Sequence, residues 1–142
     1  MIQIRPATAA DQDTIRHIVR LGKLPPYSLK WQHFLVAEED GRVIGVGQIR
    51  QHGGHNELGS LAVLPERRGQ AVGAQLMAAL ETRAGLPLYL FCREPLETYY
   101  QRFGYRLVRL PEAPGQLKMM ALLAFTLPRL FGFRIRLMRK DG

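Results

Sequence analysis

The stretch Glu57–Arg83 is ELGSLAVLPERRGQAVGAQLMAALETR, and it contains three kinds of segment in direct succession. Residues 58–64 form a short apolar run, which predicts a buried strand. Residues 65–70 form a turn with a proline, two arginines and a glycine. From Ala71 onward apolar residues recur every four positions, which predicts one face of a helix. This succession predicts an anion site, because the first N–H groups of a helix lack intrahelical acceptors and carry partial positive charge.

The turn and the strand before it resemble a known family. Residues 68–73, RGQAVG, resemble the Gln/Arg-x-x-Gly-x-Gly/Ala pyrophosphate loop of the GNAT N-acetyltransferases, and residues 61–66, LAVLPE, resemble the strand end that carries the pantetheine arm there. Ala71 stands where the pattern has its first glycine, and we expect alanine to fit a helical first turn. Without the resemblance, the stretch would be an ordinary strand, turn and helix with small packing residues. The resemblance implies that acetyl-coenzyme A is bound by Leu61, Ala62, Val63, Arg68, Gly69, Gln70, Ala71, Val72, Gly73 and Ala74.

A second signature of the same family lies further along the chain. Residues 99–105, YYQRFGY, resemble an aromatic pair followed by x-x-Phe-Gly-Phe/Tyr. In the family the second aromatic is often a tyrosine whose hydroxyl faces the coenzyme sulfur, so the resemblance implies that Tyr100 is the catalytic acid. The alternative is that all these aromatic residues belong to the core. The resemblance as a whole covers about residues 1–110.

The implied reaction moves an acetyl group from acetyl-coenzyme A to a primary amine, by direct attack in a ternary complex. The amine belongs to a small molecule, an amino acid, or a peptide or protein. Such a reaction needs a base for the amine proton and a donor for the oxyanion. Glu57 is the expected base, because the family often places a carboxylate at this strand start; a surface carboxylate is the equal alternative, and His55 or a water are rivals. The backbone N–H groups of residues 61–63 are the expected oxyanion donors.

Composition limits the other classes of function. The 142 residues fit a single domain, 1–142, and no apolar run approaches the roughly 20 residues of a membrane span. The N-terminus lacks a signal-peptide core, so the expected location is cytoplasmic. Cys92 is the only cysteine and no third ligand accompanies His52 and His55, so no metal is expected. The net charge of +8 favours an anionic partner, and coenzyme A is one.

Two other functions stay open at this stage. A catalytically idle acyl-coenzyme-A-binding or scaffold domain would carry the same loop. A basic nucleic-acid-binding module is less favoured, because the basic residues are scattered and no recognition helix is evident; no nucleic-acid partner is therefore expected.

The predicted fold is α+β and GNAT-like, with a mixed, mostly antiparallel sheet of about seven strands flanked by about four helices. Thr8 and Asp11 predict a variant capping box before the first helix. Asp40-Gly41 predicts a hairpin turn, and the glycines at 45 and 47 weaken the next strand or mark a close backbone approach.

The C-terminal region, about residues 111–142, is an addition to the family pattern. Residues 117–130, LKMMALLAFTLPRL, are strongly apolar, and residues 133–138 alternate apolar and basic side chains as a strand with one solvated face does. The apolar segment leaves three uses open: packing over the sheet, a homodimer surface, or contact with a membrane.

Overall fold

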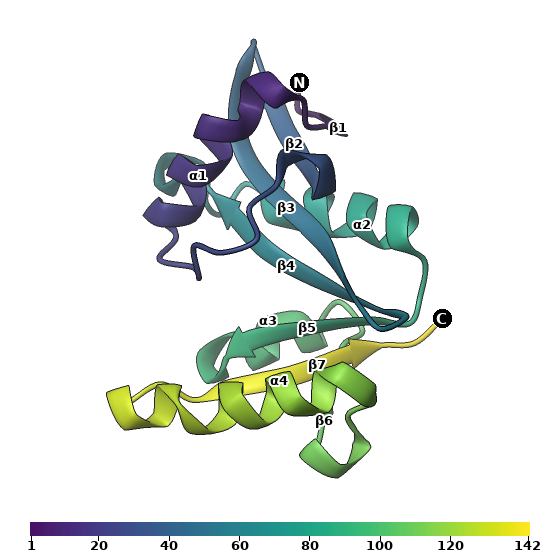
Figure 1. Ribbon diagram of the computed structural model, residues 1–142. Helices are drawn as coiled ribbons and strands as arrows, with labels where there is room; N and C mark the ends of the chain where they lie inside the picture. Colours follow the sequence, from purple (N-terminus) through teal and green to yellow (C-terminus); the bar gives the residue numbers. More distant parts are fainter. The chain divides into compact units, whose positions relative to one another are not determined.

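The computed structural model describes the backbone of residues 1–142 and every side chain except that of Phe131. Seven strands and four α-helices make up its regular elements, and the strands pair mostly antiparallel, which confirms the predicted α+β class (Figure 1). In chain order the elements are β1 Gln3–Pro6, α1 Gln12–Leu21, β2 Phe34–Glu39, β3 Arg42–His52, β4 His55–Val63, α2 Val72–Ala84, β5 Leu88–Arg93, α3 Glu97–Gln101, β6 Arg106–Val108, α4 Gly115–Thr126 and β7 Ile135–Lys140.

The chain divides into two compact parts. The first part is residues 1–50 with 58–84, and the second part is residues 51–57 with 85–142. In the first part the strands follow the order β1-β2-β3-β4, and in the second part they follow the order β5-β7-β6. The predicted turn at Asp40-Gly41 joins β2 to β3, with positive φ at both residues, as a tight two-residue hairpin requires.

Helices α1 and α2 cover opposite faces of the sheet of the first part (Figure 1). On the α2 face, a Cβ at Gly47 would lie 2.8 Å from Leu80 Cδ1, and a Cβ at Gly45 would lie 3.0 Å from Leu76 Cδ1. Real Cβ atoms essentially never come as close as at Gly47 and rarely as close as at Gly45, so both glycines let α2 pack directly on β3. The predicted close approach at these glycines is confirmed.

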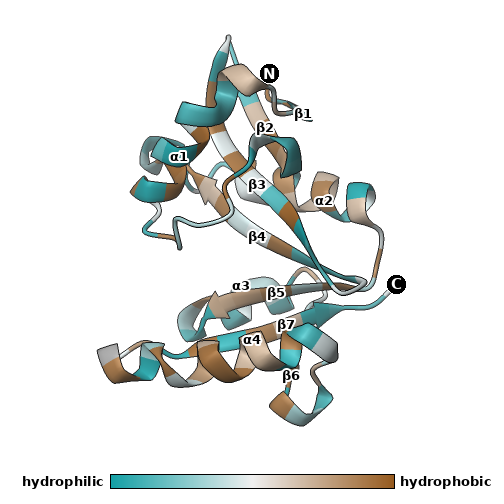
Figure 2. Ribbon diagram, viewed as in Figure 1, coloured by the Kyte–Doolittle hydropathy of each residue, from teal (hydrophilic) through white to brown (hydrophobic). Residues whose placement is uncertain are grey.

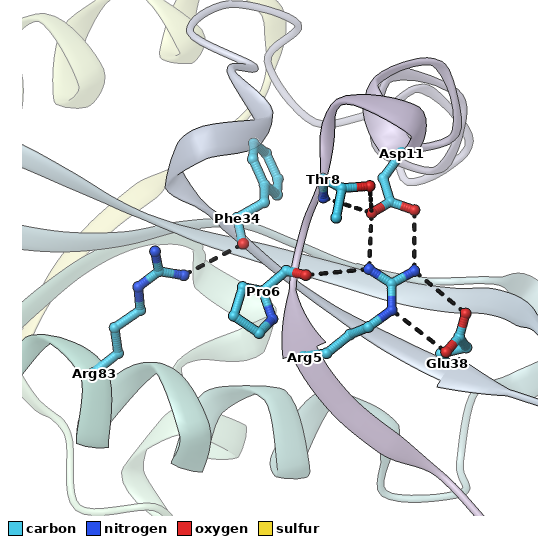
Figure 3. A network of polar contacts seen from close by, with 7 residues as sticks. All are labelled: Arg5, Pro6, Thr8, Asp11, Phe34, Glu38 and Arg83. Carbon is cyan, nitrogen blue, oxygen red and sulfur yellow. Dashed lines mark hydrogen bonds and ion pairs between the residues drawn. The ribbon is translucent and has the colours of Figure 1, made fainter.

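An ion cluster fixes the start of α1 to β1 and β2 (Figure 3). Arg5 donates to both carboxylate oxygens of Asp11, at 2.8 and 3.1 Å, and to both of Glu38, at 3.3 and 3.4 Å. The Asp11 carboxylate also accepts the backbone N–H of Thr8 at 2.7 Å, which confirms the predicted capping contact. The hydrogen bonds from Arg5 hold the pKa of Asp11 below its ordinary value.

In the second part, β5 and β7 pack side chains on both of their faces. Tyr89 and Leu137 lie on one face in a cluster with Leu117 and Ala121 of α4. The other face carries Cys92, whose Sγ lies 3.7 Å from the sulfur of Met138. The predicted apolar segment 117–130 is therefore a helix that packs on the sheet with one side only, followed by a 3-10 turn at Pro128–Phe131. Among the described residues, no helix is long and apolar enough to cross a membrane.

Candidate active site

The turn between β4 and α2 is where the predicted pyrophosphate loop lies. A 3-10 turn at Pro65–Arg67 leads into residues 68–71, and α2 begins at Val72. Gly69 and Ala71 both have left-handed backbone, with φ of +79° and +62°. The expectation that Ala71 fits a helical first turn is wrong: its φ is of the kind that glycine adopts freely and alanine only with strain, because its Cβ crowds the following carbonyl. The glycine that the family pattern has here is the residue this backbone favours.

The two arginines of the turn have different surroundings. Arg67 is partly buried, and it pairs with Glu39 at 2.7 Å and donates to the Gln70 side chain at 2.8 Å. Arg68 is exposed, and its Nε donates to the carbonyl of Val63 at 3.3 Å. Arg67 therefore ties the turn to β2 and braces Gln70, whereas the guanidinium of Arg68 is presented to solvent at the end of β4.

The shape of the turn fits a bound diphosphate. A Cβ built on Gly69 meets no atom within 4 Å, so the backbone is open to close approach there. Within α2, the N–H of Gln75 bonds back to the carbonyl of Ala71 at 3.1 Å. The N–H groups of residues 72–74 precede this first helical bond, so they lie where a helix supplies donors and partial positive charge to an anion.

A buried amide network that was not predicted from the sequence lies beside β4. Ser60 has φ of +53° in the middle of β4, and Ser28, in the loop before β2, has φ of +56°. Nε2 of Gln48, which is fully buried, donates to Ser60 Oγ at 2.9 Å and to the Ser28 carbonyl at 3.0 Å. Gln48 lies on the same inward face of β3 as Ile44 and Val46. A polar residue at such a position of an apolar strand face was the sequence signal that could have revealed this network. Strained backbone of this kind is concentrated at functional sites.

Glu57 is held by a histidine. The residue is 4% exposed, and its Oε1 lies 2.7 Å from Nε2 of His52. His55, the rival base, packs its ring edge-on against Tyr89 at a centroid distance of 5.9 Å. The expected alternative, in which Glu57 is a surface carboxylate, is wrong, because this carboxylate is buried against an imidazole. His52 is a residue that sequence reasoning weighed only as a metal ligand.

Tyr100 lies on α3 among aromatic rings. It packs edge-on against Tyr99 and Tyr105, with centroid distances of 5.2 and 6.0 Å. Burial raises the pKa of its hydroxyl, and the nearby Cys92 thiol and Tyr99 add to this. Burial also raises the pKa of Cys92 to about 11, so this thiol stays protonated at neutral pH. Tyr100 is therefore a neutral hydroxyl, able to donate a proton or a hydrogen bond.

The predicted site residues divide between the two parts of the chain. Leu61 to Val63 and Arg68 to Ala74 belong to the first part and form one continuous strand end, turn and helix start. Glu57 and Tyr100 belong to the second part. Within the described residues, no group of three His, Cys, Asp or Glu side chains could hold a metal ion.

Comparison with known proteins identifies the family of this chain. The model of the acetyltransferase (GNAT) domain matches residues 30–107, which is more than half of the chain and includes both signatures. The chain belongs to the GNAT acetyltransferases. No curated protein matches this GNAT chain significantly in sequence.

Solved structures share the fold of this GNAT chain. N-acetylglutamate synthase from Neisseria gonorrhoeae, complexed with coenzyme A and N-acetyl-glutamate, superposes with a TM-score of 0.81 at 17% identity, covering 99% of this chain but 35% of the other. A Mycobacterium tuberculosis protein in complex with coenzyme A gives 0.77 at 18% identity, with 99% of each chain covered. The ribosomal-protein-S18-alanine N-acetyltransferase of Escherichia coli gives 0.69 at 17%, covering 99% and 94%. This GNAT chain thus spans about a third of the gonococcal enzyme, and at such identities the likeness shows the fold alone.

Proposed function

We propose that residues 1–142 act as one acetyl-coenzyme-A-dependent N-acetyltransferase that acetylates a primary amine. The observation that carries the proposal is the turn at residues 68–71, in a chain of the GNAT family. This turn combines an exposed arginine, an open glycine and the start of a thirteen-residue helix. Each of these features suits the diphosphate of coenzyme A.

In this proposal the coenzyme is held at the end of β4 and the start of α2. The N–H groups from Gly69 to Ala74 and the guanidinium of Arg68 bind the diphosphate, with Gln70 fixed by Arg67. The backbone of Leu61, Ala62 and Val63 holds the pantetheine arm. The bound cosubstrate supplies the activated acetyl group, and the protein orients it and handles the protons.

The base is the His52–Glu57 pair. A neutral amine attacks the thioester carbonyl, the new N–C bond forms, and the C–S bond breaks. The amine proton passes to this pair, directly or through a water. A carboxylate hydrogen-bonded to an imidazole fixes the orientation of the ring and stabilises its protonated form. The contact of 2.7 Å between Glu57 and His52 supports their action as one unit.

Tyr100 is the proposed acid for the departing thiolate. The partly buried Tyr100 hydroxyl is protonated at neutral pH, as a tyrosine is at its ordinary pKa, and burial raises that pKa further. A hydroxyl in this state can donate its proton to sulfur as the C–S bond breaks. The backbone N–H groups of residues 61–63 are the proposed donors to the oxyanion.

We place one wall of the acceptor pocket in the loop before β2. Tyr27 in this loop is 56% exposed, and its ring lies 5.2 Å from the Arg50 guanidinium. The same guanidinium donates to Ser60 Oγ at 2.9 Å. An amine that enters beside Tyr27 would meet polar side chains and the kinked strand at Ser60. The folds of an N-acetylglutamate synthase and of a ribosomal-protein-S18-alanine N-acetyltransferase both match this chain, so free amino acids and peptide amines are the first acceptors to test.

Free-thiol release with a panel of amines, at fixed acetyl-coenzyme A, tests the activity. We expect amine-dependent release above the hydrolysis background. Calorimetry with coenzyme A tests the site: Arg68→Glu should weaken binding at least tenfold, about 1.4 kcal/mol. Arg20→Glu, at an exposed arginine on α1, is the matched charge control and should leave affinity unchanged. Equal affinities of wild type and Arg68→Glu would overturn the placement of the coenzyme.

The left-handed Ala71 gives a specific reason to keep the idle coenzyme-binding domain as a second candidate. The methyl group of a strained alanine in the phosphate turn can leave less room for the diphosphate than a glycine at this position would. An idle domain would bind coenzyme A by calorimetry but release no thiol with any amine.

A further inference from the structure

Helix α4 and the turn after it expose a continuous set of apolar side chains, which we call the apolar face. They recur at 119, 122, 123, 127 and 130, the spacing of one side of a helix. Brown bands dominate α4 in Figure 2. Leu130 is 79% exposed and Met119 is 62% exposed. The apolar face consists of Met119, Leu122, Leu123, Leu127, Leu130 and Phe133, each of them at least 43% exposed.

The opposite side of α4 is fully packed. Leu117 and Ala121 are buried completely against Tyr89 and Leu137 of the sheet in the second part. The helix is therefore docked, and its outward side stays apolar although it faces solvent. Soluble monomers rarely expose apolar patches of several large side chains without a binding role.

A shallow groove extends the apolar face at its N-terminal end. It has a volume of about 460 Å³, and it lies between the turn before α4 and the first two turns of the helix. Its lining is apolar apart from the side chain of one lysine. The residues around it are Leu110, Pro111, Gly115, Lys118, Met119 and Leu122.

The charges within the segment that carries the apolar face are all of one sign, and Glu94, which pairs with Arg134, lies outside that segment. Between Ala113 and Lys140 the sequence contains no aspartate or glutamate. Lys118, Arg129 and Arg134 are exposed along this segment. Arg134 has a loose, exposed pair with Glu94 at 3.8 Å, so it remains at the surface. The apolar face is thus bordered by cations.

The positive charge beside the apolar face distinguishes between two possible partners, a second copy of the chain and an anionic membrane. A second copy related by a two-fold axis would bring the same patch, with the same cations, against itself. Like charges brought together at an interface oppose binding, and the segment has no acid to compensate them. An anionic bilayer surface suits both features of the apolar face, because its negative headgroups can pair with the cations and its apolar layer can bury the leucines.

We propose that the apolar face of α4 lies in the headgroup layer of an anionic membrane, parallel to its surface. The helix is docked on the sheet by Leu117 and Ala121, so it would lie on the membrane without leaving the fold. Leu123, Leu127 and Leu130 enter the acyl boundary, while Lys118, Arg129 and Arg134 contact lipid phosphates. This proposal is independent of the acetyl-transfer proposal.

Co-sedimentation of the full chain with vesicles tests it. We expect binding to vesicles of phosphatidylcholine with 30% phosphatidylglycerol, on the order of tenfold stronger than to pure phosphatidylcholine, and weaker in high salt. The double variant Leu123→Gln/Leu127→Gln should lose binding at least tenfold. Leu21→Gln on α1, at a leucine that is 42% exposed, is the matched control and should bind as wild type does.

A second measurement guards against unfolding of the double variant. Arg129→Glu changes an exposed charge only, and it should weaken binding to the anionic vesicles while Arg20→Glu does not. In Leu130→Trp, the added tryptophan should shift its emission to the blue with anionic vesicles, unlike Leu107→Trp on β6. Equal binding to both vesicle types, no binding, or a dimer in sedimentation velocity that Leu123→Gln/Leu127→Gln dissociates would each overturn the proposal.

Discussion

Nε2 of His52 lies 2.7 Å from Oε1 of Glu57, which is a buried residue with 4% of its surface exposed. The two residues stand on consecutive strands, one at the end of β3 and one near the start of β4. A buried carboxylate in contact with an imidazole is an arrangement that can accept and hold a proton.

The first prediction is that Glu57→Gln lowers the single-turnover rate of acetyl transfer by about 10²–10⁴, the usual range for general base catalysis. His52→Asn should lower the rate as well. If the two act as a unit, the double variant should be no slower than the slower single variant, because such effects are not additive. The exposed carboxylate of Glu66 gives the control Glu66→Gln, which should keep the wild-type rate. A wild-type rate in Glu57→Gln would reduce the pair to a structural contact.

The second prediction is that Tyr100→Phe lowers the single-turnover rate by about a hundredfold or more. The variant keeps the ring that packs against Tyr99 and Tyr105, so coenzyme affinity and melting temperature should barely change. Saturating acetyl-coenzyme A in single turnover keeps product release from masking the loss. Tyr99→Phe is the matched control and should retain the rate. If Tyr100→Phe reacts as fast as wild type, a water is the proton donor.

The third prediction concerns strain in the phosphate turn. Ala71 has φ of +62°, which costs an alanine about 1–2 kcal/mol, whereas glycine adopts it freely but loses about 0.5–1 kcal/mol in chain entropy. Ala71→Gly should therefore be neutral or stabilising by up to about 1 kcal/mol in urea unfolding. Its affinity for coenzyme A should not fall. Ala74 lies within α2 with ordinary helical backbone, so Ala74→Gly should instead lower the free energy of unfolding by about 0.5–1 kcal/mol. A clear loss of affinity in Ala71→Gly would mean that the methyl group takes part in binding.

The fourth prediction is a pH dependence of stability at the start of α1. Arg5 lowers the pKa of Asp11, so the pair stabilises the fold above the ordinary pKa of an aspartate and loses this effect as the pH falls through the lower, folded value. Asp11→Asn should cost about 1.5–3 kcal/mol at pH 7, since it removes hydrogen bonds to a charged group. The difference between the variant and wild type should shrink below about pH 4. Urea unfolding at pH 7 and pH 3 measures it, and a cost that is equal at both values would contradict the prediction.

Local patterns predicted the elements of the chain well. The apolar run and the spacing after it predicted β4 and α2, because the hydrophobic periods of strands and helices can be recognised from residues close together in the sequence. The hairpin at Asp40-Gly41 and the capping contact of Asp11 follow from local turn chemistry in the same way. Glycines 45 and 47 predicted where α2 comes close, since only a missing side chain permits it.

The features that depend on register or on unusual backbone were not predicted. The contact of His52 with Glu57 requires β3 and β4 to place two side chains together, and sequence spacing alone does not fix this. The left-handed conformation of Ala71 was not predicted, because alanine rarely adopts it, although the glycine of the family pattern at this position was a signal for it. Gln48 carried a signal, as a polar residue on an apolar strand face, but the sequence did not indicate its two partners, the Ser28 carbonyl in a distant loop and Ser60 on β4.

The amide of Gln48 has a consequence for motion in the first part. One nitrogen serves both the Ser28 carbonyl and the Ser60 hydroxyl, and Nη2 of Arg50 likewise donates to the Tyr27 carbonyl and to Ser60 Oγ, so two side chains tie the loop before β2 to the kink in β4. An outward displacement of that loop would require Gln48 and Arg50 to break their bonds to the loop carbonyls or to move away from Ser60. The position of the loop before β2 and the backbone kink at Ser60 are therefore coupled. An acceptor that holds this loop in place would also fix the backbone of β4 at Ser60, so acceptor binding and the ordering of β4 would occur together.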